Sequence, residues 1–187
     1  MYKRQVYKRR VVGKTKTGKD KVKWERNYRS SRPEDDNSAT ILARLTEKLP
    51  EWEALDIIPN ETYGDMYCDR SKIYGVNSWR DLFSPRQLLS IGTSVEVFSE
   101  FLREEKERGS LTEAKKASFI YLAFAIDKIA DYNARLSYWD VNVERSRHVF
   151  GRHDFSFMWA YAELALLVEG LGLDWTVQAL GLHRRTR

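Results

Sequence analysis

Cysteine is nearly absent from this sequence, and so is the pairing of cysteine with histidine on which many metal sites depend. The 187 residues include one cysteine, Cys68, and three histidines. A single cysteine excludes an intrachain disulfide, and the scattered histidines do not give the Cys/His spacing of a zinc site. We therefore expect no metal in this chain and a structural role for the Cys68 thiol.

Long apolar runs are also missing. No stretch approaches the roughly 18 to 20 apolar residues that a membrane-spanning helix needs. The N-terminal sequence MYKRQVYKRR is basic and lacks the apolar segment of a secretory signal. We expect a cytoplasmic protein with no membrane partner.

The motifs of familiar catalytic devices are lacking too. There is no Pro-Pro dipeptide, and hence no Asn/Asp-Pro-Pro-aromatic loop of the kind with which amino-methyltransferases hold a flipped base. No glycine-rich loop follows a strand pattern, so nothing predicts a cradle for a dinucleotide, a triphosphate or a methyl donor. No serine lies in a nucleophile elbow, and Asp154 beside His153 is better explained as a helix cap. We predict no catalytic residue and no cofactor in this chain.

The sequence does contain enough apolar material for a folded core. Hydrophobic residues make up 42% of the chain, and six of its residues are tryptophan. This composition argues against global disorder, and the length suits a globular protein of ordinary size.

Charge is distributed unevenly along the chain. The net charge is +5, but residues 1–29 hold twelve of the 32 Lys and Arg and only two of the 27 Asp and Glu. This N-terminal arm therefore carries +10, and the remaining 158 residues carry −5. The sequence predicts an acidic body with a basic arm.

A basic arm of this kind is typical of proteins that bind DNA or another polyanion, because each Lys or Arg placed on a phosphate releases condensed counterions. Aromatic residues are interleaved with the cations and could stack on bases. The alternative is a solvated strand pair or a flexible tail, which explains the charge run equally well. The candidate nucleic-acid-binding residues of the arm are Lys3, Arg4, Lys8, Arg9, Arg10, Lys14, Lys16, Lys19, Lys21 and Lys23, and the interleaved aromatics are Tyr2, Tyr7, Trp24 and Tyr28.

Patterns in the first half of the chain predict a hairpin, a helix and a connector. Two β-prone segments flank Gly18, which predicts a β-hairpin that turns around Thr17 to Lys19. Pro33 and the acidic residues after it predict a helix over 33–48. Residues 50–82 show no sustained period and predict an irregular connector anchored by aromatic residues, for which packing is the favoured role over contact with a partner.

The second half predicts helices. Ser84-Pro85 predicts the start of one helix, and the capping-box spacing from Ser110 to Glu113 predicts the next, so that the two form a long αα-hairpin. The segment SFMWAYAELALLVEG, residues 156–170, is apolar nearly all round and predicts a buried helix, with a short helical turn near 175–180. The expected fold is mainly α with a small N-terminal β-hairpin (α+β), divided into a basic arm over 1–29 and a helical domain over 30–187.

Arginines outside the arm are further candidates for phosphate contact, because the planar guanidinium suits phosphate geometry. Ion pairs with Glu144, Asp81 or Asp154 explain them nearly as well. The candidates in this region are Arg80, Arg86, Arg147, Arg152 and His153.

Four segments of the chain resemble a known family. They contain Tyr74-Gly75 and the run WRDLFSPRQLL within 74–93, DKIADYNARLSYW within 121–140, VFGRHDFSFMWAYAELA at 149–165, and GLGLDWTVQ at 170–178. In this order they resemble the middle region of the large adenine-specific DNA methyltransferases that begin with a domain of unknown function and carry a zinc ribbon. The acidic start RPEDD and the run PEWEALDIIP also fit, so the resemblance covers about residues 30–178.

The resemblance implies an association with DNA methylation. The family's zinc-ribbon cysteines and methyl-donor half lie upstream of the matching region, and its Pro-Pro motif lies downstream; none of these parts is in this sequence. S-adenosylmethionine is therefore implied only for the full-length family. We expect a non-catalytic fragment or split subunit that positions DNA or supports a catalytic methyltransferase subunit; the alternatives are a stand-alone nucleic-acid-binding module and a structural or interaction protein.

Overall fold

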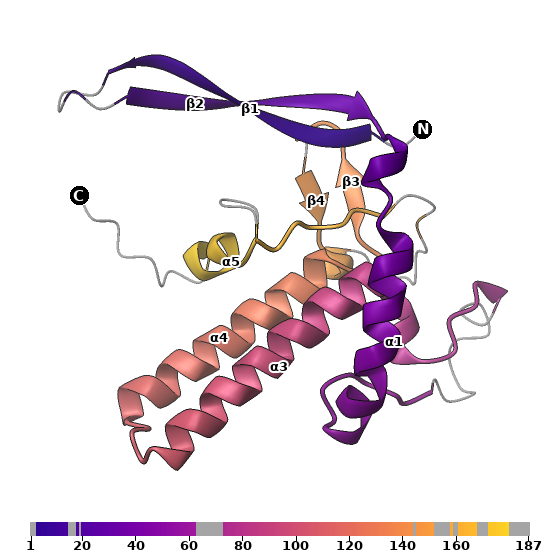
Figure 1. Cartoon of the computed structure of the whole chain (residues 1–187), viewed down its shortest axis with the longest axis vertical. Coiled ribbons are helices and arrows are strands. Elements are labelled where there is room, and N and C mark those ends of the chain that lie inside the picture. Colours follow the sequence, from indigo (N-terminus) through magenta and orange to yellow (C-terminus); the bar gives the residue numbers. More distant parts are fainter. Residues whose placement is uncertain are drawn as a thin grey trace. The chain divides into compact units, whose positions relative to one another are not determined.

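The computed structural model describes residues 3–14, 18, 20–62, 73–143, 145–151, 158, 161–167 and 172–179, with the backbone alone at 3–9, 21–28, 178 and 179. Two compact units are present, one formed by Met1–Ala39 and the other by Thr40–Arg187. The division falls ten residues after the predicted end of the arm at Arg29. The fold is mainly helical with antiparallel strand pairs, so the expected α+β class is confirmed (Figure 1).

The first unit contains the predicted hairpin. Strand β1 (Lys3–Lys14) pairs antiparallel with β2 (Asp20–Ser30), and we call this pair the ribbon. The register shifts between Val11 and Gly13, where one extra residue forms a bulge that strengthens the local twist. Gly18 has a φ of 78°, as its predicted place in the turn requires, while residues 15–17 and 19 lie outside the described residues.

The predicted helix over 33–48 is wrong at both ends. Pro33–Asp35 forms one turn of 3₁₀-helix, and helix α1 runs from Ser38 to Ala54. The acidic side chains bond to nearby backbone instead of continuing a helix: Asp35 accepts from the Arg32 N–H at 3.0 Å, and Asp36 accepts from the Ser38 N–H at 2.9 Å.

At its C-terminal end, α1 continues through Pro50 because Trp52, two residues further on, is buried in the core. A proline inside a helix costs about 3 kcal/mol. The Trp52 side chain is fully buried with Leu45, Ile58 and Leu88 in the core of the helical unit. Burying an indole removes on the order of 200 Å² from water, worth about 5 kcal/mol, which exceeds the cost of the proline.

The predicted connector over 50–82 is partly structured. Its first residues belong to α1, and Trp79–Leu82 forms a 3₁₀ turn. Between them, Thr62 and Ser78 form an isolated antiparallel bridge. Of its predicted aromatic anchors, Trp52 is buried whereas Tyr74 and Trp79 are exposed, and Tyr63 and Tyr67 lie outside the described residues.

The predicted αα-hairpin is confirmed. Helices α3 (Pro85–Glu107) and α4 (Glu113–Tyr132) lie side by side in antiparallel orientation (Figure 1). Ser84 caps α3 as expected, accepting from the Gln87 N–H at 3.2 Å. The cap of α4 is Thr112 rather than the predicted Ser110, because the Ser110 hydroxyl donates to Glu105 Oε2 at 2.7 Å in the turn between the helices.

The expected buried helix over 156–170 is wrong for the residues that the structure describes. Residues 161–167 follow an irregular path, and the next helix is α5 (Leu173–Ala179). Side chains of α3 and of the residue that follows α4 bond to this backbone: Gln87 Nε2 donates to the Ala162 carbonyl at 3.2 Å, and Asn133 Oδ1 accepts from the Leu164 N–H at 2.9 Å. Backbone groups held in this way are not available for the i to i−4 bonds of a helix.

A short hairpin of β3 (Tyr138–Asp140) and β4 (Arg145–Arg147) follows α4. Tyr132 at the end of α4 packs edge-to-face on Trp175 of α5, with ring centroids 5.1 Å apart. None of the helices in the described part of the chain combines the length and apolar character that crossing a bilayer requires.

Candidate nucleic-acid interface

The ribbon concentrates the positive charge of the chain. Ten of the 23 residues in its two strands are Lys or Arg, and two are acidic. An extended strand of twelve residues spans roughly 40 Å. The fold therefore turns the sequence's basic arm into a long, thin element with a high density of cations.

The base of the ribbon is fixed by an ion pair. The Arg29 guanidinium donates two hydrogen bonds to the Asp35 carboxylate, at 2.6 and 2.7 Å. These bonds raise the pKa of Arg29, against an opposing effect of burial. A bidentate pair of this kind holds two planar groups in one geometry and joins the second strand to the 3₁₀ turn after it. Arg29 thus serves the local fold rather than a ligand.

Further out along the ribbon, the described side chains are exposed. Arg10 and Lys14 are exposed, and so are Val11 and Val12, at 52% and 47%. Of the other predicted site residues in the arm, Lys3, Arg4, Lys8, Arg9, Lys21 and Lys23 have described backbone positions in the strands, and Lys16 and Lys19 lie outside the described residues.

The candidate arginines of the helical unit lie in ion pairs. Arg80 pairs with Glu53, and Arg86 Nη1 lies 3.0 Å from Glu163 Oε2. A phosphate would have to displace a carboxylate from each of them. These partners differ from the Glu144, Asp81 and Asp154 considered from the sequence.

Arg147 contacts its carboxylate partner through two nitrogens. Its Nε and Nη2 lie 2.9 and 2.8 Å from Asp140 Oδ2, across the β3–β4 hairpin. The bond from Arg147, followed by the Asn142 N–H, holds the pKa of Asp140 below its ordinary value. Arg152 and His153 lie outside the described residues. Among the described residues, the structure thus does not bring Arg80, Arg86 and Arg147 together into one basic site.

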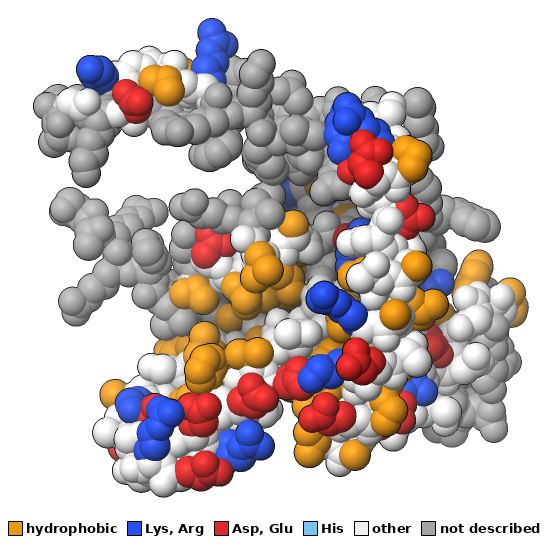
Figure 2. All heavy atoms as spheres, in the orientation of Figure 1, with side chains coloured by type: hydrophobic (Ala, Val, Ile, Leu, Met, Phe, Trp, Pro, Cys, Tyr) orange, Lys and Arg blue, Asp and Glu red, His pale blue; other side chains and the backbone are white. Residues whose placement is uncertain are grey.

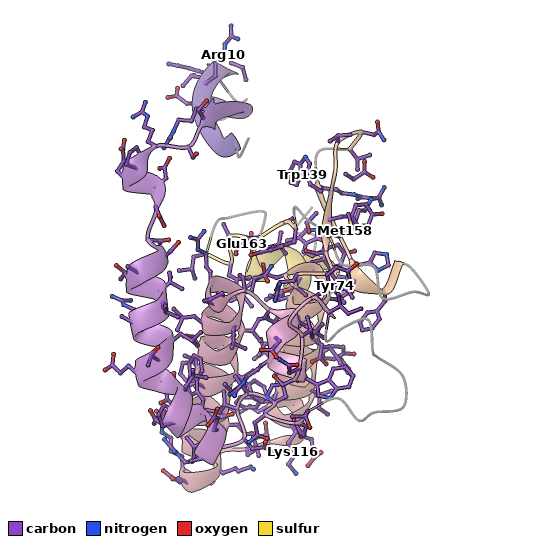
Figure 3. All side chains as sticks on the ribbon, turned by 90° about the vertical axis from the view of Figure 1, so that its right-hand side faces the viewer. Arg10, Tyr74, Lys116, Trp139, Met158 and Glu163 are labelled. Carbon is purple, nitrogen blue, oxygen red and sulfur yellow. The ribbon has the colours of Figure 1, made fainter. Side chains whose placement is uncertain are left out.

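A polar junction lies among the described residues of the helical unit. Ser84 Oγ donates to Glu163 Oε1 at 2.6 Å, and Ser137 Oγ donates to the Ala162 carbonyl at 3.1 Å. Figure 3 shows Glu163 at the end of the α3–α4 hairpin opposite to Lys116. A cavity of about 270 Å³ lies here, lined by parts of α3, the end of α4 and residues 163–167.

This junction joins the four segments on which the methyltransferase resemblance rests. Segment 74–93 bonds to 149–165 through Gln87, and segment 121–140 bonds to 149–165 through Asn133. Segment 170–178 packs on 121–140 through Trp175. The charged groups at this junction, Arg86 and Glu163, are paired with one another.

Sequence reasoning did not identify Glu163 or Asn133. A signal was present for Glu163, since it is the only charged residue between Asp154 and Glu169. A charged side chain that is buried within an apolar run needs a partner, so its position in such a run indicates an ion pair or a hydrogen bond. Asn133 gave no signal, because an asparagine after a helix is ordinary.

The search for a metal site in the described part of the chain and the comparisons with known proteins gave no match. Among the described residues, no group of three His, Cys, Asp or Glu is arranged to hold a metal ion; Cys68 lies outside them. No family model matches the chain, and no curated protein and no solved structure shows significant similarity to it. The resemblance to adenine-specific methyltransferases stays a prediction that rests on the quoted residues.

Proposed function

We propose that this chain binds nucleic acid through the ribbon and that the helical unit supports the ribbon without chemistry of its own. The observation that carries the proposal is the folding of the +10 arm into one antiparallel element on which ten cations lie within 23 residues. Such a density of charge on a slender element suits a phosphate backbone, and each contact releases counterions.

The charge of the helical unit supports this division of labour. Figure 2 shows red and blue side chains intermingled at the turn of the α3–α4 hairpin. Several of these form ion pairs: Lys115 with Glu105, Arg108 with Glu104 at 2.8 Å, and Lys116 with Glu113 at 2.7 Å. Cations matched in this way offer little net attraction to a polyanion.

The proposal is tested by removing three ribbon cations in the full chain. The variant is Lys3→Gln, Arg9→Gln and Arg26→Gln, and its binding to a fluorescein-labelled 20-nucleotide DNA and to the matching duplex is measured by anisotropy over a series of salt concentrations. The slope of log affinity against log salt should become shallower by about 2 for the single strand and by about 3 for the duplex.

The matched control removes the same charge elsewhere. Arg44→Gln, Arg103→Gln and Lys106→Gln neutralise three exposed cations of the helical unit and leave the ribbon intact. If net charge alone drives binding, the two triple variants lose affinity equally, and the proposal is wrong. Unchanged slopes in the ribbon variant would contradict it as well.

A second candidate function is that the chain serves as the non-catalytic part of a DNA adenine methyltransferase whose catalytic residues are supplied by another chain. It is favoured by the meeting of the four resembling segments in one junction, as one packed body of the family would require. Titration calorimetry of the full chain with S-adenosylmethionine should give no binding heat. Clear micromolar binding would show a methyl-donor site in this chain and refute the non-catalytic role.

A further inference from the structure

The two faces of the ribbon differ in composition, and the register shows how. Gln5 pairs with Tyr28, Tyr7 with Arg26, and Arg9 with Trp24. Alternate residues of a strand belong to the same face, and directly paired residues share a face. These six residues therefore lie on one face, which we call the aromatic face.

The opposite face carries charge without aromatic residues. It consists of the pairs Arg4 with Arg29, Val6 with Asn27, Lys8 with Glu25, and Arg10 with Lys23. We call it the basic face. Five of its eight residues are cations, and Arg29 among them is engaged by Asp35. Both faces thus contain cationic residues, whereas the aromatic residues of the two strands are confined to one.

The register also separates the aromatic residues from one another. Tyr7 and Trp24 are each paired with an arginine, and Tyr28 is paired with glutamine, so no two aromatic residues are directly opposite. Direct cross-strand pairs of aromatic residues are among the more stabilising contacts of a hairpin, and the register of the ribbon contains none. Tyr7 instead lies diagonal to Trp24 and Tyr28, with arginine beside it.

We propose that the aromatic face binds single-stranded nucleic acid, with unpaired bases stacked on Tyr7, Trp24 and Tyr28 and phosphates near Arg9 and Arg26. The inference rests on the proposed function and names its ligand class. In a duplex the flat faces of the bases are covered by neighbouring bases, so aromatic rings at the surface gain little. In a single strand every base has a π-face to offer, and a groove or face that combines such rings with cations is the usual way to hold it.

The described side chains next to the aromatic face are open to solvent. Val11 continues this face from Arg9 and is 52% exposed, and Arg10 on the basic face is also exposed. Described residues of both faces are thus exposed at this part of β1, as an extended ligand that runs along the strand requires.

The test compares single strands with a duplex in the full chain. The probes are a labelled 20-nucleotide oligo(dT), the corresponding oligo(U), and a 20-base-pair duplex of mixed sequence, all at one salt concentration. The wild type should bind at least one of the single strands more tightly than the duplex. The ratio of the affinities for oligo(dT) and oligo(U) shows whether the preferred single strand is DNA or RNA. Trp24→Val and Tyr28→Val should each weaken single-strand binding by about 5- to 150-fold. The salt slope should not change, because no cation is lost.

Two controls accompany these variants. Phe150→Val removes an aromatic side chain of the helical unit that is 81% exposed, and it should leave single-strand affinity unchanged. Trp24→Phe keeps a flat ring at the central position and should retain most of the affinity. Valine keeps a high β-propensity, and circular dichroism with thermal melting verifies that each variant is folded.

The outcomes separate this inference from the proposed function. If Trp24→Val weakens single-strand and duplex binding equally, or weakens neither, the inference that bases stack on the aromatic face is wrong. The proposal that the ribbon binds nucleic acid would still hold. If Trp24→Val and Tyr28→Val both lower the melting temperature while single-strand affinity persists, the face packs against protein and the inference is overturned. If the wild type binds none of the three probes, the proposed function itself fails.

Discussion

At the scale of single residues, the core depends on one glycine. Gly92 in α3 lies against the ring of Trp52, and a Cβ built on Gly92 would come within 2.7 Å of Trp52 Cε3 and Cη2. Such a contact is shorter than carbon atoms tolerate. The buried Trp52 Nε1 has no acceptor among the described residues, so the indole is held there by packing and not by a hydrogen bond.

We therefore predict that Gly92→Ala destabilises the protein by about 2 kcal/mol or more, because overpacking a filled core costs 1 to 3 kcal/mol. The sign is informative, since Gly→Ala at an open helix position stabilises by about 0.5 to 1 kcal/mol. Urea unfolding followed by tryptophan fluorescence measures the change. Ser99→Ala, at an exposed position of the same helix, is the control and should have an effect within about 0.5 kcal/mol. A stabilised Gly92→Ala variant would show that Trp52 does not occupy this place.

At the scale of elements, caps determine where the helices and turns begin. Asp81 Oδ2 accepts three hydrogen bonds at the start of the Trp79–Leu82 turn, from the Asn77 N–H at 2.9 Å, the Ser78 N–H at 2.8 Å and the Ser78 hydroxyl at 3.0 Å. Burial alone would raise the pKa of Asp81, but these bonds outweigh it and lower the pKa below the ordinary value of 3.8. The ionised form is thus the one that the fold prefers.

This preference gives the protein a pH dependence of stability at acid pH. A carboxyl whose pKa is lowered on folding stabilises the protein fully above its unfolded-state pKa, here 3.8, and that contribution is lost as the pH falls through the lower, folded-state pKa. Asp81→Asn should cost about 1 kcal/mol at pH 7, where the wild-type carboxylate is ionised. Below about pH 4 the difference from the wild type should shrink. Urea unfolding at pH 7 and pH 3 measures it, and an equal difference at both would contradict the role of the charge.

Local patterns predicted some elements and missed others for a physical reason. The start of α3 was predictable because Ser84-Pro85 is a cap followed by the residue that suits the first helical position. The start of α4 was predicted two residues early, because Ser110 and Thr112 are both good caps. Gly109 distinguishes the two candidates, because its φ of 63° allows the Ser110 N–H to donate to the Glu105 carbonyl at 3.2 Å. Ser110 thereby belongs to the end of α3, and Thr112 caps α4.

The position of the ribbon was predictable from the sequence, but the composition of its two faces was not. Alternation of polar and apolar residues is weak here, so the sequence alone does not fix which residues pair. The bulge between Val11 and Gly13 shifts the register of the outer end, and only the folded hairpin shows that Tyr7 pairs with Arg26. The sequence therefore predicted candidate residues, and the register distributed them between the faces.

At the scale of the whole molecule, the polar junction joins segments distant in sequence. Arg135 after α4 donates from its N–H to the Leu82 carbonyl at 2.7 Å and from Nη1 to the Asp81 carbonyl at 2.9 Å. Asn133 Oδ1 accepts from the Leu164 N–H, and Asn133 is 1% exposed. Buried bonds of this kind order the irregular segment 161–167 without a helix of its own.

We predict that Asn133→Ala destabilises the protein by about 2 kcal/mol, because the Leu164 N–H loses its acceptor and a buried unpaired donor costs 1 to 3 kcal/mol. Hydrogen exchange at the amide of Leu164 should also accelerate relative to amides in the middle of α3. Asn142→Ala, at an exposed position in the β3–β4 hairpin, should change stability by less than about 0.5 kcal/mol. Unchanged exchange at Leu164 in the Asn133 variant would show that this bond does not hold the segment.

The sequence by itself determined the features that depend on near neighbours: the basic arm, the hairpin around Gly18, the α3–α4 hairpin and the start of α3. Each follows from charge counts, turn chemistry or an apolar period, which act over a few residues. The tertiary structure decided what depends on distant partners. Trp52 kept α1 helical through Pro50, the side chains of Gln87 and Asn133 drew 161–167 away from a helix, and acidic residues far along the chain engaged Arg80 and Arg86. Burial and pairing across the fold outweigh local propensity because each is worth several times more free energy than the preference of a single residue for helix or strand.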